Sequence, residues 1–354
     1  MYLHINMEQK MISLCRCSIE DFPNELFYEI FNYLDGCQIH QTFSYLNSRF
    51  QQLINSSSFQ LKMKFWSNTL DDDCLNEIFC FNKQQIYSLN LNESFSLNPI
   101  DSLFICLESL RISSINSKKL LLFLSNLQSL PRLNSLTIEI LHCNINYPEI
   151  YYEIFTLRTL KHFKLSIDNH LASSQFASFN PNKQISNLES LVINHEWFFP
   201  SISNMLSYIP NLRHLTFTKT FYFHSLMQKN LSIYIIWPNL THLSMCLSLH
   251  SRVMFEYFEV LIRKIGLNIK VFSLKTSSEN TDYLNASRWE NLISNSMPQL
   301  DKFYLKYSEN VNRIFNYNID EINDFTSSFW IKQKWILEIE INNQNIIFSV
   351  SPYK

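Results

Sequence analysis

Three histidines occupy the same place in three short apolar segments, LKHFKL, LRHLTF and LTHLSM. They are His162, His214 and His242. Imidazole is a common ligand of zinc and other transition metals, so histidines on neighbouring segments could share an ion. A segment with Ser190 at this place lies between His162 and the other two, and no carboxylate or cysteine cluster completes a ligand set. The sequence therefore predicts no metal site and favours solvated histidines that face a ligand.

Other catalytic chemistry has little support in the sequence. His195 and Glu196 are adjacent, but neighbours on a strand point to opposite faces and would not converge on one substrate atom. The 8 cysteines are scattered without a CxxC pair, which is typical of reduced thiols. The chain has only two glycines, Gly36 and Gly266, so glycine-rich nucleotide loops and the nucleophile elbow are absent. We expect neither an enzyme nor a bound cofactor.

The composition is that of a globular protein. The chain has 354 residues, of which 46% are hydrophobic and 15% aromatic. Its formal charge of -2 gives no general attraction to nucleic acid or to an anionic membrane. No apolar run approaches the length of about 18 residues that a membrane span needs, and charged residues interrupt the N-terminal segment where a signal peptide would be apolar. We expect an intracellular soluble protein of the cytoplasm or nucleus.

The segment DFPNELFYEIFNYLDG, residues 21–36, predicts an amphipathic helix. Asp21 can cap it, Pro23 suits the first turn, and Gly36 follows where a left-handed C-cap is expected. Two further short helices are predicted by the apolar spacing that follows, with apolar residues at Ile39, Phe43 and Leu46 in one and Phe50, Leu53 and Ile54 in the other. Three helices this short cover little of their own apolar surface, so they form either an end cap for a larger domain or a docking module.

The run FPNELFYEIFNYL, residues 22–34, resembles the opening of the F-box, Leu-Pro-x-Glu-Leu/Ile followed by a helix. Phe22 stands where leucine is usual, and Phe50 stands where many F-boxes have tryptophan. The resemblance covers residues 19–58 and implies binding to the Skp adaptor of a Cullin-RING ubiquitin ligase. The adaptor-binding residues that it implies are Phe22, Pro23, Glu25, Leu26, Ile30, Phe31 and Leu34.

Beyond residue 85 a pattern of apolar residues at positions 1, 4 and 6 recurs nine times. Successive copies begin 21 to 31 residues apart, and Pro131, Pro210, Pro238 and Pro298 each stand two residues before a copy. Each copy predicts a short strand, and the copies are IYSLNL (86–91), LESLRI (107–112), LNSLTI (133–138), LKHFKL (160–165), LESLVI (188–193), LRHLTF (212–217), LTHLSM (240–245), IKVFSL (269–274) and LDKFYL (300–305).

Helical spacing between the strands, at 119–130, 148–157, 201–209 and 251–265, completes a repeat that resembles the leucine-rich repeat over residues 85–308. The asparagine expected eight residues after the first apolar position is missing, so the repeats are irregular. Gly266 is expected to stop the helix 251–265. Residues 59–84 are expected to be a helical linker, with a helix in LDDDCLNEIFCF, and residues 309–354 a cap with a hairpin that begins at ILEIEI.

In such a strand the apolar residues point into the core, and those between them face the concave surface. This surface should be polar and mildly basic. The candidate target-binding residues are Arg111, His162, Lys164, His214, Thr216, His242, Ser244, Lys302 and Tyr304.

The predicted fold is α/β: a tail at 1–18, an F-box-like three-helix module, then an irregular leucine-rich-repeat solenoid with parallel strands on its concave face, helices on its convex face and a C-terminal β-hairpin cap. The favoured function is substrate recognition in an SCF-type ligase. The expected partners are the Skp adaptor, through it a cullin scaffold, and an unidentified target protein. A repeat scaffold with no ligase role and a catalytic repeat protein are the alternatives.

Overall fold

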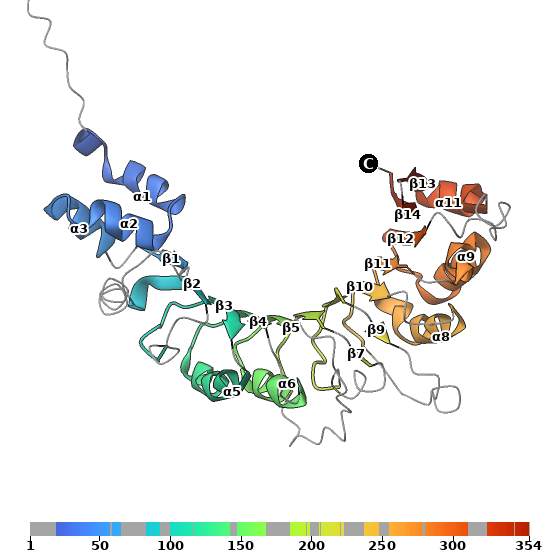
Figure 1. Cartoon of the computed structure of the whole chain (residues 1–354), viewed down its shortest axis with the longest axis horizontal. Coiled ribbons are helices and arrows are strands. Elements are labelled where there is room, and N and C mark those ends of the chain that lie inside the picture. Colours follow the sequence, from blue (N-terminus) through green and yellow to red (C-terminus); the bar gives the residue numbers. More distant parts are fainter. Residues whose placement is uncertain are drawn as a thin grey trace, which may run out of the picture.

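A computed structural model describes most of the chain and places it on an arc, with strands along the inner side (Figure 1). The described residues are 19–56, 59–64, 83–92, 100–115, 117–141, 147–167, 185–195, 197–198, 205, 207–219, 221–222, 237–247, 255–277, 280–310, 324–342 and 344–353. A group of helices forms one end of the arc, and a hairpin forms the other end. Within the described residues no helix is long and apolar enough to cross a membrane.

The N-terminal group contains the three predicted helices. They are α1 Asn24–Asn32, α2 Gly36–Phe43 and α3 Ser48–Ile54, preceded by the 3-10 helix η1 Ile19–Asp21. Phe27 contacts Phe50 edge to face at 4.8 Å between ring centroids, and Phe31 contacts Phe43 at 5.0 Å. These aromatic pairs form the centre of the group. Leu46, predicted to belong to the second helix, lies after the end of α2 and is exposed.

The predicted ends of the first helix are wrong. Pro23, rather than Asp21, is the N-cap of α1, and it makes no side-chain capping bond. Gly36 does not close this helix but begins α2, where Asp35 is the N-cap and forms a capping box with Gln38. Neither glycine has a positive φ, and Gly266 begins the 3-10 helix η5 Gly266–Asn268 after α8 Phe255–Ile265. The prediction that a left-handed C-cap accounts for the two glycines is therefore wrong.

Twelve strands among the described residues form one sheet in the order β1-β2-β3-β4-β5-β6-β8-β10-β11-β12-β14-β13. The strands from β1 to β12 pair in parallel. All nine predicted strands are present, as β2 Ile86–Asn92, β3 Ser109–Ile115, β4 Ser135–Ile140, β5 His162–Ile167, β6 Ser190–Asn194, β8 His214–Phe217, β10 His242–Leu247, β11 Val271–Thr276 and β12 Lys302–Asn310. A separate parallel pair joins β7 Trp197–Phe198 and β9 Phe221–Tyr222.

Helices cover the outer side of the arc (Figure 1). The helices predicted at 119–130, 148–157 and 251–265 are present, while most of the one predicted at 201–209 lies outside the described residues. The outer helices are α5 Ser117–Asn126 with η3 Leu127–Ser129, α6 Tyr147–Thr156, α8, and α9 Ala286–Ser296 with η6 Thr281–Leu284 before it. The apolar residues of the strand pattern are buried against this layer, so strands and helices share one continuous core.

The linker was predicted to be helical, but its first part is a strand. β1 Leu61–Lys64 alternates buried Leu61 and Met63 with exposed Lys62 and Lys64, and it pairs with β2. This alternation has the period of two that a strand requires. The helix predicted in LDDDCLNEIFCF lies outside the described residues.

The predicted C-terminal hairpin is present as β13 Trp335–Ile341 and β14 Asn345–Pro352, after η8 Asp324–Thr326 and α11 Ser328–Gln333. Its second strand, β14, pairs antiparallel with β12 and extends the sheet. Trp330 and Trp335 contact Phe303 of β12 at 5.8 and 5.5 Å between ring centroids, so the hairpin is joined to the core of the last parallel strand.

Candidate functional site

The sheet register aligns all nine predicted concave residues in two rows. Strand pairing puts His162, His214, His242 and Lys302 in the first row. The second row, two residues further along each strand, contains Arg111, Lys164, Thr216, Ser244 and Tyr304. None of these nine side chains is buried. The strand geometry therefore gives one accessible face that could bind a partner protein.

Part of this face is already occupied by internal contacts. Arg111 forms an ion pair with Glu139 at 2.6 Å, and Ser113 donates a hydrogen bond to the same carboxylate. Asn194 donates to the Ser166 hydroxyl at 2.7 Å and accepts from Thr218. These bonds run from strand to strand and hold the side chains in fixed positions. Arg111 is consequently less free to bind a target than Lys302, which forms no ion pair with a described carboxylate.

His214 and His242 are close neighbours, with ring centroids 4.2 Å apart and planes inclined by 32°. The two rings lie close together at a tilt, whereas a shared metal would lie in the plane of each ring, along the nitrogen lone pairs. No group of three potential ligands occurs among the described residues. Burial lowers the pKa of His242 below its ordinary value, and His214, Lys270 and Lys302 lower it further.

The lowered pKa of His242 predicts a loss of stability in acid. The folded state disfavours the protonated ring, so below about pH 6.5 the unfolded chain binds more protons and the free energy of unfolding decreases. His242→Gln should reduce this decrease, measured by urea unfolding on either side of about pH 6.5. His162→Gln is the matched control, because Ser190 separates His162 from the histidine pair. An unchanged pH dependence in His242→Gln would contradict the prediction.

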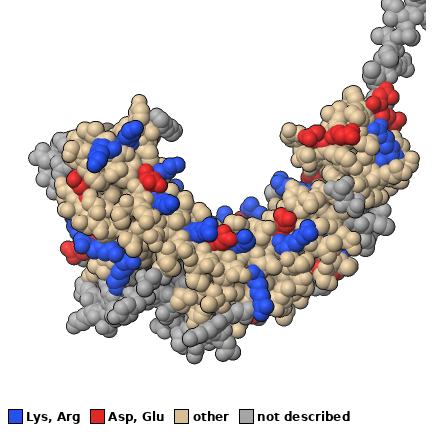
Figure 2. Space-filling view, turned by 180° about the vertical axis from the view of Figure 1, so that it is seen from behind, with Lys and Arg blue, Asp and Glu red and all other residues tan. Residues whose placement is uncertain are grey.

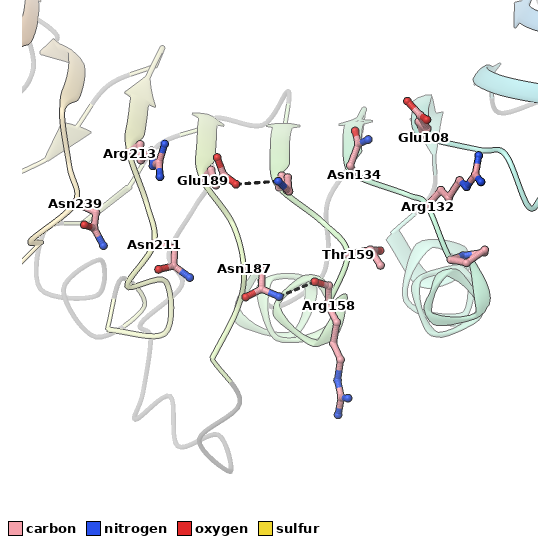
Figure 3. A pocket seen from close by; sticks show the side chains of 12 residues that line it. Glu108, Arg132, Asn134, Arg158, Thr159, Asn187, Glu189, Asn211, Arg213 and Asn239 are labelled. Carbon is pink, nitrogen blue, oxygen red and sulfur yellow. Dashed lines mark hydrogen bonds and ion pairs between the residues drawn. The ribbon is translucent and has the colours of Figure 1, made fainter.

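A groove of about 700 Å³ lies along the amino ends of the strands (Figure 3). Lys161, Glu189 and Arg213 each stand directly before a strand, and Lys161 forms an ion pair with Glu189 at 3.2 Å. The hydrogen bond and charge of Lys161 hold the pKa of Glu189 below its usual value. The full lining is Glu108, Pro131, Arg132, Asn134, Arg158, Thr159, Lys161, Asn187, Glu189, Asn211, Arg213 and Asn239. Figure 2 shows acidic and basic side chains alternating across the middle of the arc.

Sequence reasoning missed the asparagines at this edge. Asn187, Asn239 and Asn268 donate from their side chains to the backbone oxygens of Arg158, Pro210 and Pro238, at 2.8 to 2.9 Å. Each bond joins one repeat to the one before it. The expected asparagine was sought eight residues after the first apolar residue, but here it stands directly before that residue. The Pro-Asn-Leu sequence at 238–240 is a signal that could have found one of them, Asn239.

His195 lies inside the core and not on the accessible face of the strands. Its Nε2 lies 2.8 Å from the hydroxyl of Tyr151, and both side chains are buried. The pair therefore satisfies two polar groups inside the core. Glu196 lies outside the described residues, so its part in the rejected acid–base pair is not described.

At the N-terminal end of the arc, the residues of the amphipathic stripe have different environments. Phe22 and Leu26 are each 40% exposed, and Pro23 and Glu25 are also exposed. Ile30 and Leu34 are partly buried against the core. Phe31 is 2% exposed and belongs to the core of the helical group, so its side chain does not face solvent. The exposed apolar side chains before and within the first turns of α1 leave a surface that a partner could cover.

Arg49 of α3 holds the segment before α1. Its guanidinium donates to the backbone oxygens of Glu20 and Phe22 and to the side-chain oxygen of Asn24. It also lies 5.4 Å from the ring centroid of Phe27. One cation thus fixes the backbone on both sides of the exposed Phe22 side chain.

This helical region corresponds to a known domain family. The family model described as F-box domain matches residues 19–62. The chain contains an F-box domain. The F-box domain implies an adaptor-binding role of the SCF type, and F-box proteins are generally non-catalytic. The matched range extends beyond the predicted boundary at residue 58 and into β1, which agrees with the packing of α2 against that strand.

The two unusual residues of this F-box domain have different structural roles. Phe50 is fully buried and fills the centre of the F-box domain against Phe27 and Phe43. Phe22 is exposed on one side and lies 6.5 Å from Phe27 between ring centroids. The change at Phe50 therefore concerns the core, and the change at Phe22 concerns the surface.

A comparison with curated proteins gives no match. A solved structure described as the crystal structure of the Rad7 and Elc1 complex in yeast is similar at 14% identity and a TM-score of 0.25, covering 73% of this chain and 88% of that chain.

Proposed function

We propose that the protein is the substrate-recognition subunit of an SCF-type Cullin-RING ubiquitin ligase. The F-box domain binds the Skp adaptor, the adaptor binds a cullin scaffold, and the concave face of irregular leucine-rich repeats binds a target protein. The observation that carries this proposal is the F-box match at residues 19–62 together with the exposed Phe22 and Leu26. A helical group that served only as an end cap would have no need of such a surface.

The proposed division of the chain follows from these roles. Residues 19–58 would be the docking module, 59–84 the link, 85–308 the repeats and 309–354 a C-terminal cap, with 1–18 as a tail. The docking module and the concave face lie at different places on one arc (Figure 1). A target held on the concave face would stay close to a ubiquitin-charged enzyme, so affinity would be converted into effective concentration without bond chemistry in this chain. This role belongs to the cytoplasm or nucleus.

The adaptor-facing surface would consist of Phe22, Pro23, Glu25 and Leu26. Ile30 and Leu34 would support it from their half-buried positions, and Phe31 would act from the core by fixing α1. A repeat scaffold with no ligase role remains the second candidate, because the parallel sheet and its accessible rows would serve it equally well.

The test is direct binding of the full chain to a purified Skp-type adaptor. We expect a dissociation constant below the micromolar range for the unmutated chain. The triple variant Phe22→Ala, Pro23→Ala, Leu26→Ala should lose about a hundredfold or more in affinity, since interface anchors of this kind contribute about 2 kcal/mol or more each. Arg49→Met should weaken binding by a smaller factor, because it frees the backbone that presents Phe22.

The control for this test is the double variant Ile331→Ala, Ile341→Ala. Both residues are exposed at the other end of the arc, so their truncation removes similar apolar surface without touching the F-box domain. If the unmutated chain fails to bind the adaptor at micromolar concentration, the ligase role is wrong and the scaffold is favoured.

A further inference from the structure

The groove at the amino ends of the strands is separate from the two rows on the concave face. Its lining residues precede β3, β4, β5, β6, β8 and β10, so it crosses six strand ends. Neighbouring strands lie about 4.8 Å apart, which gives a length of about 24 Å and room for about seven residues of extended peptide. Its volume of about 700 Å³ and its open form suit a chain segment lying across the strands.

The charge of the groove favours an acidic ligand. Arg132, Arg158 and Arg213 are exposed, and none of them forms an ion pair with a described carboxylate. Glu189 is neutralised by Lys161 at 3.2 Å, which leaves Glu108 as the one further carboxylate in the lining. The groove therefore has an excess of positive charge, carried by guanidinium groups that bind carboxylates with paired hydrogen bonds.

The amides of the groove favour a peptide backbone. Asn187 and Asn239 use their side chains to join successive repeats, but Asn134 and Asn211 make no side-chain hydrogen bond within the described part of the chain. A carboxamide has both a donor and an acceptor, which matches the N–H and C=O of a peptide group. Figure 3 shows Asn134 and Arg213 at the starts of their strands and Asn211 in the loop that leads to β8.

We propose that this groove binds an extended acidic segment of a partner protein, with free amides contacting its backbone and arginines contacting carboxylates on alternate residues. In an extended segment, alternate side chains point the same way and lie about 6.8 Å apart, so one side of the segment can meet Arg132 and Arg213. Assigning the segment to a ligase target rests on the proposed function, whereas the binding itself does not.

The experiment uses the full chain and a fluorescein-labelled peptide of about seven residues that alternates Glu with Ser. We expect the peptide to bind, as measured by an increase in fluorescence anisotropy, and its affinity to fall as salt is added. A peptide in which every Glu is replaced by Gln should not bind. The variant Arg132→Glu, Arg213→Glu should lose about tenfold or more in affinity. The matched control Lys119→Glu, Lys332→Glu reverses two exposed charges on α5 and α11 and should bind as the unmutated chain does.

Three outcomes would overturn the proposal: equal affinity for the Glu and Gln peptides, tighter binding of a short DNA duplex than of the peptide, or loss of binding in Lys275→Glu, Lys306→Glu with none in the arginine variant. The last result would place the ligand on the concave face of β11 and β12. The triple variant of the F-box domain that is expected to lose adaptor binding should bind the peptide as the unmutated chain does. The peptide experiment therefore tests the groove even if the chain does not bind the adaptor.

Discussion

Trp289→Ala is expected to lower the free energy of unfolding by about 3 to 5 kcal/mol, as removal of a fully buried aromatic side chain does. Trp289 is completely buried between α8, β11 and β12. Its ring contacts Phe255, Phe303 and Phe258 at 5.0, 5.1 and 5.5 Å between centroids. The indole N–H also donates to the backbone oxygen of Tyr283 at 2.9 Å. The Ala variant loses all of these contacts and leaves a cavity.

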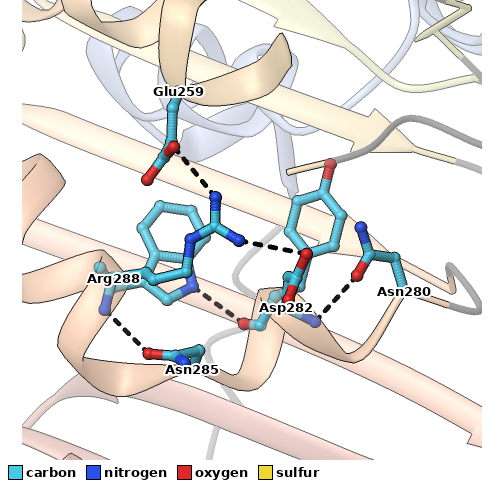
Figure 4. A network of polar contacts seen from close by, with 7 residues as sticks. Glu259, Asn280, Asp282, Asn285 and Arg288 are labelled. Atoms are coloured by element: carbon cyan, nitrogen blue, oxygen red, sulfur yellow. Dashed lines mark hydrogen bonds and ion pairs between the residues drawn. The ribbon is translucent and has the colours of Figure 1, made fainter. Parts of the chain in front are cut away.

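The neighbouring polar network limits how far this region can collapse into the cavity (Figure 4). Arg288 forms ion pairs with Glu259 of α8 at 3.0 Å and with Asp282 of η6 at 3.1 Å. Its guanidinium also lies 4.7 Å from the ring centroid of Phe255. Asn285 caps α9 by accepting from the backbone N–H of Arg288 at 2.9 Å. These contacts fix the helices around Trp289, so a large part of the lost volume should remain empty.

The measurement is urea unfolding followed by far-ultraviolet circular dichroism. Trp289→Phe is the control, because it keeps one aromatic ring in the core and loses the hydrogen bond and the second ring, and its loss of stability should be less than half as large. Hydrogen exchange should show the greatest loss of protection in α8, α9 and β11. A loss in Trp289→Ala no greater than that in Trp289→Phe would mean that the cavity closes and that the packing argument is wrong.

The result also bears on the concave face. Lys302 and Tyr304 extend from β12, and Phe303 between them contacts Trp289. A weakened core under β12 would therefore disturb two of the predicted target-binding residues without changing them.

The strands could be predicted because the repeated apolar pattern indicates both strand formation and burial. The apolar residues at positions 1, 4 and 6 are both strand-forming and buried, as Leu136 and Ile138 of β4 are. The fate of the amphipathic stripe in α1 could not be predicted in the same way. Leu26 and Phe27 are adjacent apolar residues, yet Leu26 is exposed and Phe27 is buried. Only the packing of α3, which brings Phe50 against Phe27, decides between them.

The two glycines show most clearly what could not be predicted from the sequence. The left-handed positions among the described residues belong to Ser114 and Lys334, with φ of 61° and 58°. Both glycines have ordinary backbone angles, so their role depends on atoms that are distant in sequence. A Cβ on Gly36 would collide with the Met63 sulfur, and one on Gly266 would meet the backbone oxygen of Ser296. Such contacts appear only when the tertiary structure is known.

Gly266→Ala should therefore destabilise the protein by about 3 kcal/mol, at the upper end of the usual range for overpacking. The added Cβ would lie 2.6 Å from the Ser296 oxygen and 2.8 Å from Met297 Cγ. The first of these atoms is backbone at the end of α9, so relief requires the ends of α8 and α9 to move apart. Because α8 and α9 pack against each other, that movement would open the core around Trp289.

Gly36→Ala is the matched comparison, and its loss should be less than half that of Gly266→Ala. The closest atom there belongs to the Met63 side chain, which can change rotamer, and the Lys62 backbone oxygen is 3.3 Å away. Gly36 also lies in the first turn of α2, where alanine offsets part of the cost by its higher helix propensity, about 1 kcal/mol. Urea unfolding of the two variants decides the matter. If Gly36→Ala loses as much stability as Gly266→Ala, the distinction between a backbone and a side-chain obstacle does not hold in this fold.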